Sequence, residues 1–197
     1  MAQYKVTHPY AATIKAEPEG AEATYGELLK LGEMIEIDVS PNFNEGSLYG
    51  DNALCEYVKE FKDIDVTLNT TTMPVKAYEI LFGQKVTGDG EHIAANINDV
   101  SNYVGFGFVK GEMVKNVTTY FAVWLPKVKF TLPSEKCTTK GESITWGTPS
   151  ITGKGTCDGT GDWKKTDRFA TEAEAIAFIK GKVAEAQSAQ AKKAVEK

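Results

Sequence analysis

A period-two alternation of apolar and polar residues recurs along the chain and predicts β-strands. In residues 33–39, Ile35, Ile37 and Val39 alternate with acidic residues, which is typical of a strand with one buried face. Residues 63–68 repeat the pattern, with aspartates between aliphatic residues. We therefore expect two strands that each turn an apolar face toward a core and a polar face outward.

Three further stretches predict strands of other kinds. Residues 103–109 place Val104, Phe106 and Phe108 on one face and glycines on the other, which favours close approach of another backbone. Residues 117–125 are apolar on both faces, as in a central strand. We expect Pro126 to end this strand and a second strand to follow over 128–132. The glycine-rich segment 144–156 predicts one or two more short strands.

Two segments carry helix signals. Residues 75–82 follow Pro74, a favoured residue at a helix start, and precede Gly83, a favoured residue just beyond a helix end. Near the C-terminus, Thr171 and Glu174 have the spacing of a capping box, and apolar residues then recur at helical intervals. These signals predict a short internal helix and a C-terminal helix.

The expected elements favour a mainly β fold, β-dominated α+β, in the form of a β-sandwich or partly open barrel with a short flanking helix and a C-terminal helix. A chain of 197 residues can bury one core of good size. The composition changes after Trp163. We therefore expect a β-domain over residues 1–165 and a C-terminal helix and tail over 166–197.

Residues 40–52 are rich in Pro, Asn and Gly and predict a loop that is longer than most connections. The segment nevertheless carries Phe43, Leu48 and Tyr49. A loop with such residues is a candidate contact arm toward another molecule. The other interpretation is that these side chains pack against the core of their own subunit.

The charge of the chain restricts the kinds of molecule that it is expected to bind. The net charge is −5 and Arg168 is the single arginine, which argues against binding nucleic acid through its phosphates. Acidic residues occupy the polar positions of two predicted strands: Glu36, Asp38, Asp63 and Asp65. A third predicted strand has the basic residues Lys127 and Lys129. Such faces could pair with each other or between neighbouring molecules. The acidic faces could instead line a passage for an anionic polymer, which they would repel.

The chain offers little catalytic or metal-binding chemistry. Its two histidines, His8 and His92, do not cluster with cysteines. A loop with three aspartates could bind calcium, but the spacing does not match an EF-hand and favours a solvated turn; these residues are Asp158, Asp162 and Asp167. We therefore expect no cofactor, no metal and no enzymatic activity.

Cysteine use and hydropathy bear on the compartment. The cysteines, Cys55, Cys137 and Cys157, are odd in number and scattered, which favours thiols in a reducing cytoplasm, although Cys137 and Cys157 could lie close together across strands. No apolar run reaches the ~20 residues that span a bilayer. The first residues also lack the apolar segment of a secretory signal. We expect no membrane association.

The order of these elements resembles the major tail protein, or tail tube protein, family of long-tailed, non-contractile phages. The resemblance runs from about residue 35 to 163 and rests on these segments: Gly50-Asp51-Asn52-Ala53-Leu54, residues 63–69, Leu81-Phe82-Gly83, residues 103–109, and Tyr120-Phe121-Ala122-Val123-Trp124. It lies in the order of elements and not in any one short motif.

This resemblance implies a structural subunit of the virion, assembled in the cytoplasm of a bacterial host. Subunits of the family form stacked hexameric rings, in which hairpins build an inner β-barrel for the passage of DNA without specific binding. Other tail proteins (tape measure, tail terminator and distal tail) would be its partners. Phe43, Leu48 and Tyr49 would then contact a neighbouring ring, and the acidic faces would line the channel. The alternative is a monomeric β-sandwich module that binds carbohydrate or a host surface through an aromatic platform, with Trp146 and Trp163 as candidates.

Overall fold

The computed structural model describes residues 2–88, 90, 92–135, 139 and 147–195; for Ala2 and residues 184–195 it describes the backbone alone. Two residues of the sequence analysis, Cys137 and Trp146, lie outside the described residues. The expected free thiol of Cys137, its distance from Cys157 and the contribution of Trp146 to an aromatic platform are therefore not tested.

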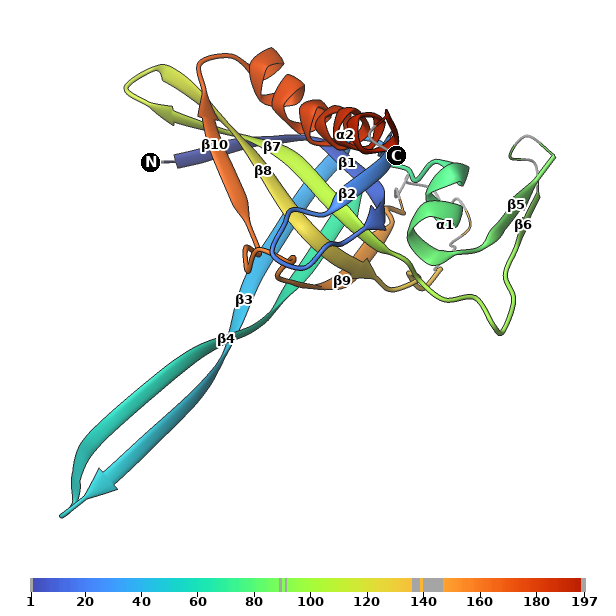
Figure 1. Ribbon diagram of the computed structural model, residues 1–197. Coiled ribbons are helices and arrows are strands. Elements are labelled where there is room, and N and C mark those ends of the chain that lie inside the picture. Colours follow the sequence, from blue (N-terminus) through green and yellow to red (C-terminus); the bar gives the residue numbers. More distant parts are fainter. Residues whose placement is uncertain (1, 89, 91, 136–138, 140–146, 196–197) are drawn as a thin grey trace.

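The fold is mainly β, as the sequence predicts. Within the described residues, eight strands form one antiparallel sheet in the order β2-β1-β7-β8-β9-β4-β3, and β10 pairs with β8 (Figure 1). The strands are β1 (Ala2–Ala16), β2 (Thr24–Lys30), β3 (Met34–Gly50), β4 (Ala53–Thr70), β7 (Tyr103–Val114), β8 (Val117–Phe130), β9 (Ser150–Thr156) and β10 (Lys165–Phe169). The sheet curls so that β1 contacts β3, which gives a sandwich-like, partly open barrel.

The main core fills the inside of this curl. Inward residues of β4, β7, β8 and β9, among them Ile64, Phe106, Phe130 and Ile151, are at most 1% exposed. The helix α1 (Val75–Phe82) packs its buried residues against this core. It ends at Gly83, whose φ of 69° is left-handed, as expected for a residue just beyond a helix. A small hairpin of β5 (Lys85–Thr87) and β6 (His92–Ala94) follows.

A second core lies on the outer face of the sheet, beneath the C-terminal helix. The helix α2 (Glu172–Val195) buries Ala175, Ile179 and Val183 there. Its start is the predicted capping box: the Thr171 N–H donates to Glu174 Oε2 at 3.1 Å, and the Glu174 N–H donates to Thr171 Oγ1 at 3.3 Å. Figure 1 shows α2 lying across the sheet.

Trp124 organises the second core, and glycines make room for it. Its ring meets Tyr25 edge to face at 5.0 Å, and its Nε1–H donates to the Tyr25 hydroxyl at 3.3 Å. An added Cβ at Gly105 would lie 2.4 Å from both rings, and one at Gly107 would lie 2.6 Å from Trp124. The predicted close approach at these glycines is thus an approach of side-chain rings.

The prediction that Pro126 ends a strand is wrong, because β8 continues through it to Phe130. On one side, the pairing with β7 is interrupted between Leu125 and Val128. On the other side, pairing with β10 stops at Trp124 and pairing with β9 starts at Lys127. Since Pro126 has no ladder partner on either side, its missing N–H removes no hydrogen bond from the sheet.

The prediction of a loop over residues 40–52 is also wrong. These residues form the outer part of β3, which pairs with β4 as far as a two-residue turn at Asp51 and Asn52. Both turn residues have positive φ, 48° and 62°, as a tight hairpin requires. Pro41 is tolerated because β3 is an edge strand of the sheet in the described residues. Figure 1 shows this hairpin projecting far beyond the rest of the molecule, at the lower left.

Candidate assembly surface

The outer part of the β3–β4 hairpin is exposed along its whole length. Every residue from 43 to 60 is exposed, whereas in residues 63–70, at the base of β4, buried positions alternate with half-buried or exposed ones. We call residues 43–60 the arm. The neighbouring strand β9 pairs with β4 only from Ile64 to Asn69, so the arm is a two-stranded ribbon. Such a ribbon is marginally stable alone in water.

The arm carries large apolar side chains that water would otherwise surround. Their exposed fractions are Phe43 41%, Leu48 65%, Tyr49 68%, Leu54 56%, Tyr57 51% and Val58 49%. A concentration of such residues on one projecting element marks an interaction surface rather than the scattered apolar residues of an ordinary surface. The three contact candidates from the sequence, Phe43, Leu48 and Tyr49, all belong to it. The other three lie on β4, for which the sequence predicted acidic candidates but no apolar contact residues.

Aromatic contacts fix the base of the arm to the body of the molecule. The Phe61 ring stacks on Trp163 at 5.4 Å and meets Phe43 edge to face at 6.3 Å. The Lys59 ammonium lies 4.6 Å from the Phe43 ring centroid and 2.6 Å from Glu45 Oε1. The direction in which the arm leaves the sheet is therefore set by packing, while the part beyond Phe43 has no support.

The four acidic candidates lie on the outer face at the root of the hairpin. Glu36 accepts a hydrogen bond from Asn69 at 3.2 Å, and Asp38 accepts one from Ser40 at 3.3 Å. The strand is less regular than its alternation predicts: a register shift next to Ile35 leaves that side chain 48% exposed, while Ile37 and Val39 pack against the core.

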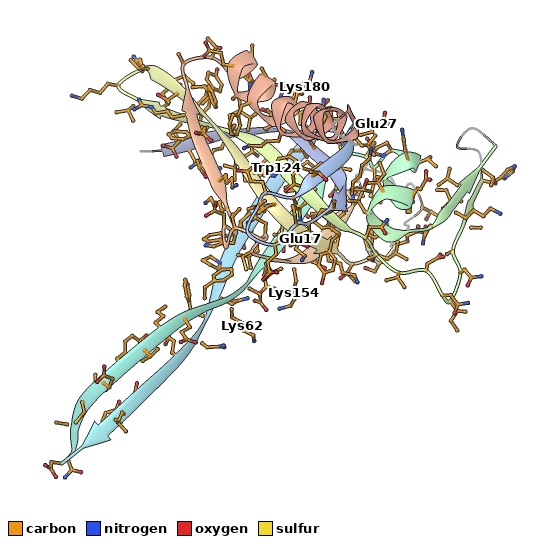
Figure 2. The ribbon with its side chains drawn as sticks, in the orientation of Figure 1. Glu17, Glu27, Lys62, Trp124, Lys154 and Lys180 are labelled. Carbon is orange, nitrogen blue, oxygen red and sulfur yellow. The ribbon has the colours of Figure 1, made fainter. Side chains whose placement is uncertain are left out.

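Asp63 and Asp65 share two partners. The Asn42 side-chain amide donates to both carboxylates at 2.7 Å, and Lys154 Nζ lies 3.4 Å from Asp63 and 3.2 Å from Asp65. The hydrogen bond from Asn42 is the largest cause that lowers the pKa of both carboxyls, and Lys154 lowers it further. Figure 2 shows Lys154 and Lys62 at the root of the hairpin. The face is thus acidic with a lysine among its carboxylates.

Sequence reasoning missed Lys154 as a partner of these aspartates. It paired the acidic faces with Lys127 and Lys129, but β9 lies between β4 and β8. Lys127 instead bonds to Glu17 at 2.5 Å. The signal for Lys154 was present, because Thr152 and Lys154 alternate with Ile151 and Gly153, but the order of the strands is not a local property of the sequence.

The aspartates near the C-terminus do not form one loop. Asp158 Oδ1 accepts the backbone N–H groups of Thr160 and Asp162, which ties a turn together, and Lys165 Nζ lies 3.5 Å from Asp162. Asp167 lies apart from them on β10, opposite Ala122. In the part of the chain that the structure describes, no group of three or more His, Cys, Asp or Glu side chains is arranged to hold a metal ion.

The two histidines lie apart from each other on different strands. His8 is on β1 with a φ of 58°, and its Nδ1 lies 3.4 Å from Glu172 Oε1, next to the start of α2. His92 is exposed on β6. Among the described helices, neither has the length and hydropathy to cross a membrane.

Comparisons of the sequence with protein-family models and with curated proteins find no match in either.

Proposed function

We propose that this chain is a self-assembling structural subunit, the tail tube subunit of a long-tailed, non-contractile phage, which polymerises as stacked hexameric rings around a channel for DNA. The single observation that carries this proposal is the arm: a projecting ribbon, exposed on every residue and rich in large apolar side chains. Copies of the same chain cover such an element repeatedly, because a contact that does not close on itself continues as a tube.

The ends of the sheet support the same proposal. Within the described residues, β2, β3 and β10 each pair with one strand only, so their outer backbone groups have no strand partner. Exposed edges are templates for pairing with another chain, and proteins that act as monomers usually cover or shorten them. A subunit that completes its strands with copies of itself needs no such protection.

The rival function, a monomeric module that binds carbohydrate or a host surface, has less support. An aromatic platform needs an exposed ring, but Trp163 is half-buried and stacked on Phe61. The proposed subunit acts by assembly, with other tail proteins as partners and without turnover, and DNA passes without specific binding. Glu36, Asp38, Asp63 and Asp65 are the candidates to line the channel, with Lys154 among them.

Electron microscopy tests the proposal, both on the purified, concentrated chain and directly on lysates of bacteria that express it. We expect rings or tubes with a central channel. A matched variant keeps the base of the hairpin and replaces residues 44–60 by an Asn-Gly turn, which closes on the Phe43–Phe61 pair. Because the removed residues are exposed, it should fold with an unchanged core but not assemble. Monodisperse monomers of the complete chain in both preparations would contradict the proposal.

A further inference from the structure

We infer that the arm of one copy docks on a basic surface of the next copy, formed by β7, β8 and β10. This inference rests on the proposed self-assembly and names the receiving surface. Two exposed surfaces on different parts of the chain carry opposite charges. The contacts within one subunit leave charged side chains on both surfaces without an ion-pair partner.

One face of the arm is acidic and apolar. Cross-strand pairs place Glu56 opposite Leu48, Val58 opposite Gly46, and Glu60 opposite Asn44. Because side chains two apart on a strand share a face, Glu56, Val58 and Glu60 point the same way. Among the described residues, neither Glu56 nor Glu60 has an ion-pair partner, whereas Glu45, on the other face, is bonded to Lys59. We call this surface the acidic face of the arm.

The receiving surface is a patch across three strands, which we call the basic flank. Lys110 of β7 and Arg168 of β10 both pair with Phe121 of β8, one on each side of it. Direct cross-strand partners share a face, so the two cations flank the Phe121 ring; Lys110 Nζ lies 4.8 Å from the ring centroid. Arg168 also donates to the Thr119 hydroxyl at 3.4 Å.

The basic flank has unsatisfied charge and exposed apolar area of its own. Along the same face toward the β7–β8 turn, Val114 is 46% and Val117 is 66% exposed. In the described part of the chain, no carboxylate lies within ion-pair distance of Arg168 or of Lys164, which directly precedes β10 and lies 5.7 Å from the Trp163 ring centroid. Lys110 is held at 2.8 Å by Glu112, which lies on the same face. The pKa of Lys164 is lowered, first by partial desolvation and then by the charge of Lys110. An incoming carboxylate would relieve this clustering of positive charge.

The two surfaces therefore match in kind: carboxylates around aliphatic side chains on one, cations around aliphatic and aromatic side chains on the other. Among the described residues no ion pair joins them within one subunit, and the arm extends to the lower left of Figure 1 while the β7–β8 turn lies at the upper left. A contact between two different surfaces of identical copies is head-to-tail, which is the kind that propagates. Complementary charge fixes its register and speeds encounter.

Charge exchange between two variants tests this docking. The first variant is Glu56→Lys with Glu60→Lys, which leaves both surfaces of each copy basic. The second is Lys164→Glu with Arg168→Glu, which leaves both surfaces acidic. All four residues are exposed, so each variant should melt at the temperature of the unmodified chain. We expect neither variant to assemble alone, and an equimolar mixture to form tubes in which the two copies alternate. Glu19→Lys with Glu79→Lys, two exposed carboxylates outside both surfaces, is the matched control and should assemble normally.

The outcomes separate the docking from the proposed function. If the unmodified chain forms tubes and each variant alone does so too, or if the mixture fails to restore assembly, the basic flank is not the receiving surface, although the subunit still assembles. If the unmodified chain forms no tubes at all, the proposed function fails first. Retention of a short DNA duplex by the unmodified chain, lost in Lys164→Glu with Arg168→Glu, would assign the flank to nucleic acid instead and overturn the inference.

Discussion

Asp65 of β4 lies directly opposite Lys154 of β9, and their charged groups are 3.2 Å apart. The same lysine reaches Asp63 at 3.4 Å, and Asn42 donates to both carboxylates. The polar face of β4 is acidic, and a lysine of β9, a strand distant in sequence, therefore partly neutralises its charge. If this face lines a channel for DNA, it combines repulsion from carboxylates with a lysine held among them.

The first prediction concerns the pKa values of Asp63 and Asp65, which lie below the ordinary value of 3.8. Since the Asn42 hydrogen bond is the largest single cause and Lys154 adds to it by hydrogen bond and charge, Asn42→Ala and Lys154→Met should each raise both pKa values. NMR titration of the side-chain carboxyls measures this, with the exposed Asn44→Ala as control. A larger effect of Lys154→Met would show that the lysine, and not the amide, dominates.

The same shifts predict a pH dependence of stability. A carboxyl with a lowered folded pKa stabilises the fold above its unfolded pKa and loses that contribution as pH falls through the folded value. The gap in melting temperature between the unmodified chain and Asn42→Ala should therefore be full at neutral pH and close below pH 3.8. Thermal melts from pH 7 to 2 test the sign. A gap that widens in acid would exclude this linkage.

The second prediction concerns the close packing at Gly105. An added Cβ would lie 2.4 Å from both Trp124 and Tyr25, which are buried and cannot move aside. Gly105→Ala should therefore lower the free energy of unfolding by about 1–3 kcal/mol. Gly46→Ala in the arm is the matched control: nothing lies within 4 Å of its added Cβ, so its change should stay within about 0.5 kcal/mol. Urea denaturation of both variants measures the difference.

Local pattern predicted those elements that have at least one buried face. Residues 63–68, 103–109 and 75–82 lie in β4, β7 and α1 as expected, because burial imposes the period that the sequence displays. The arm was misread as a loop for the same reason: a strand with no buried face has no alternation to show. Polar and glycine residues are tolerated in the arm because its strands have no third neighbour to pack against.

The candidate site was predictable in part. Phe43, Leu48 and Tyr49 are apolar residues in a segment whose sequence lacks the alternation typical of a buried face. Apolar residues in such a segment were predicted to be exposed, and all three are exposed. The basic flank could not be found in this way. Lys110, Phe121 and Arg168 meet only because β10 pairs with β8, a strand far from it in sequence. Such pairing depends on the whole fold and leaves no mark in the local pattern.

The third prediction concerns the start of α2. Replacing Thr171 by Ala removes the hydroxyl that accepts the Glu174 N–H, which should lower the free energy of unfolding by about 1 kcal/mol. Thr171→Ser keeps the hydroxyl and should stay close to the unmodified chain. Because Ala175 and Ile179 pack beneath this helix, the loss should appear in global urea denaturation. Equal stability of the two variants would mean that packing alone sets the helix start.

The fourth prediction concerns the arm directly. Leu48→Asp with Tyr49→Asp places two charges on side chains that are 65% and 68% exposed, so the subunit should keep its melting temperature. If the arm is buried between copies, the desolvation of these unpaired charges should abolish tubes in electron micrographs. The control is Ile97→Asp, because Ile97 is 98% exposed and lies outside the arm; it should leave assembly unchanged. Tubes of normal length from the double variant would remove Leu48 and Tyr49 from the contact, whereas loss of tubes in both variants would point to a general effect of added charge.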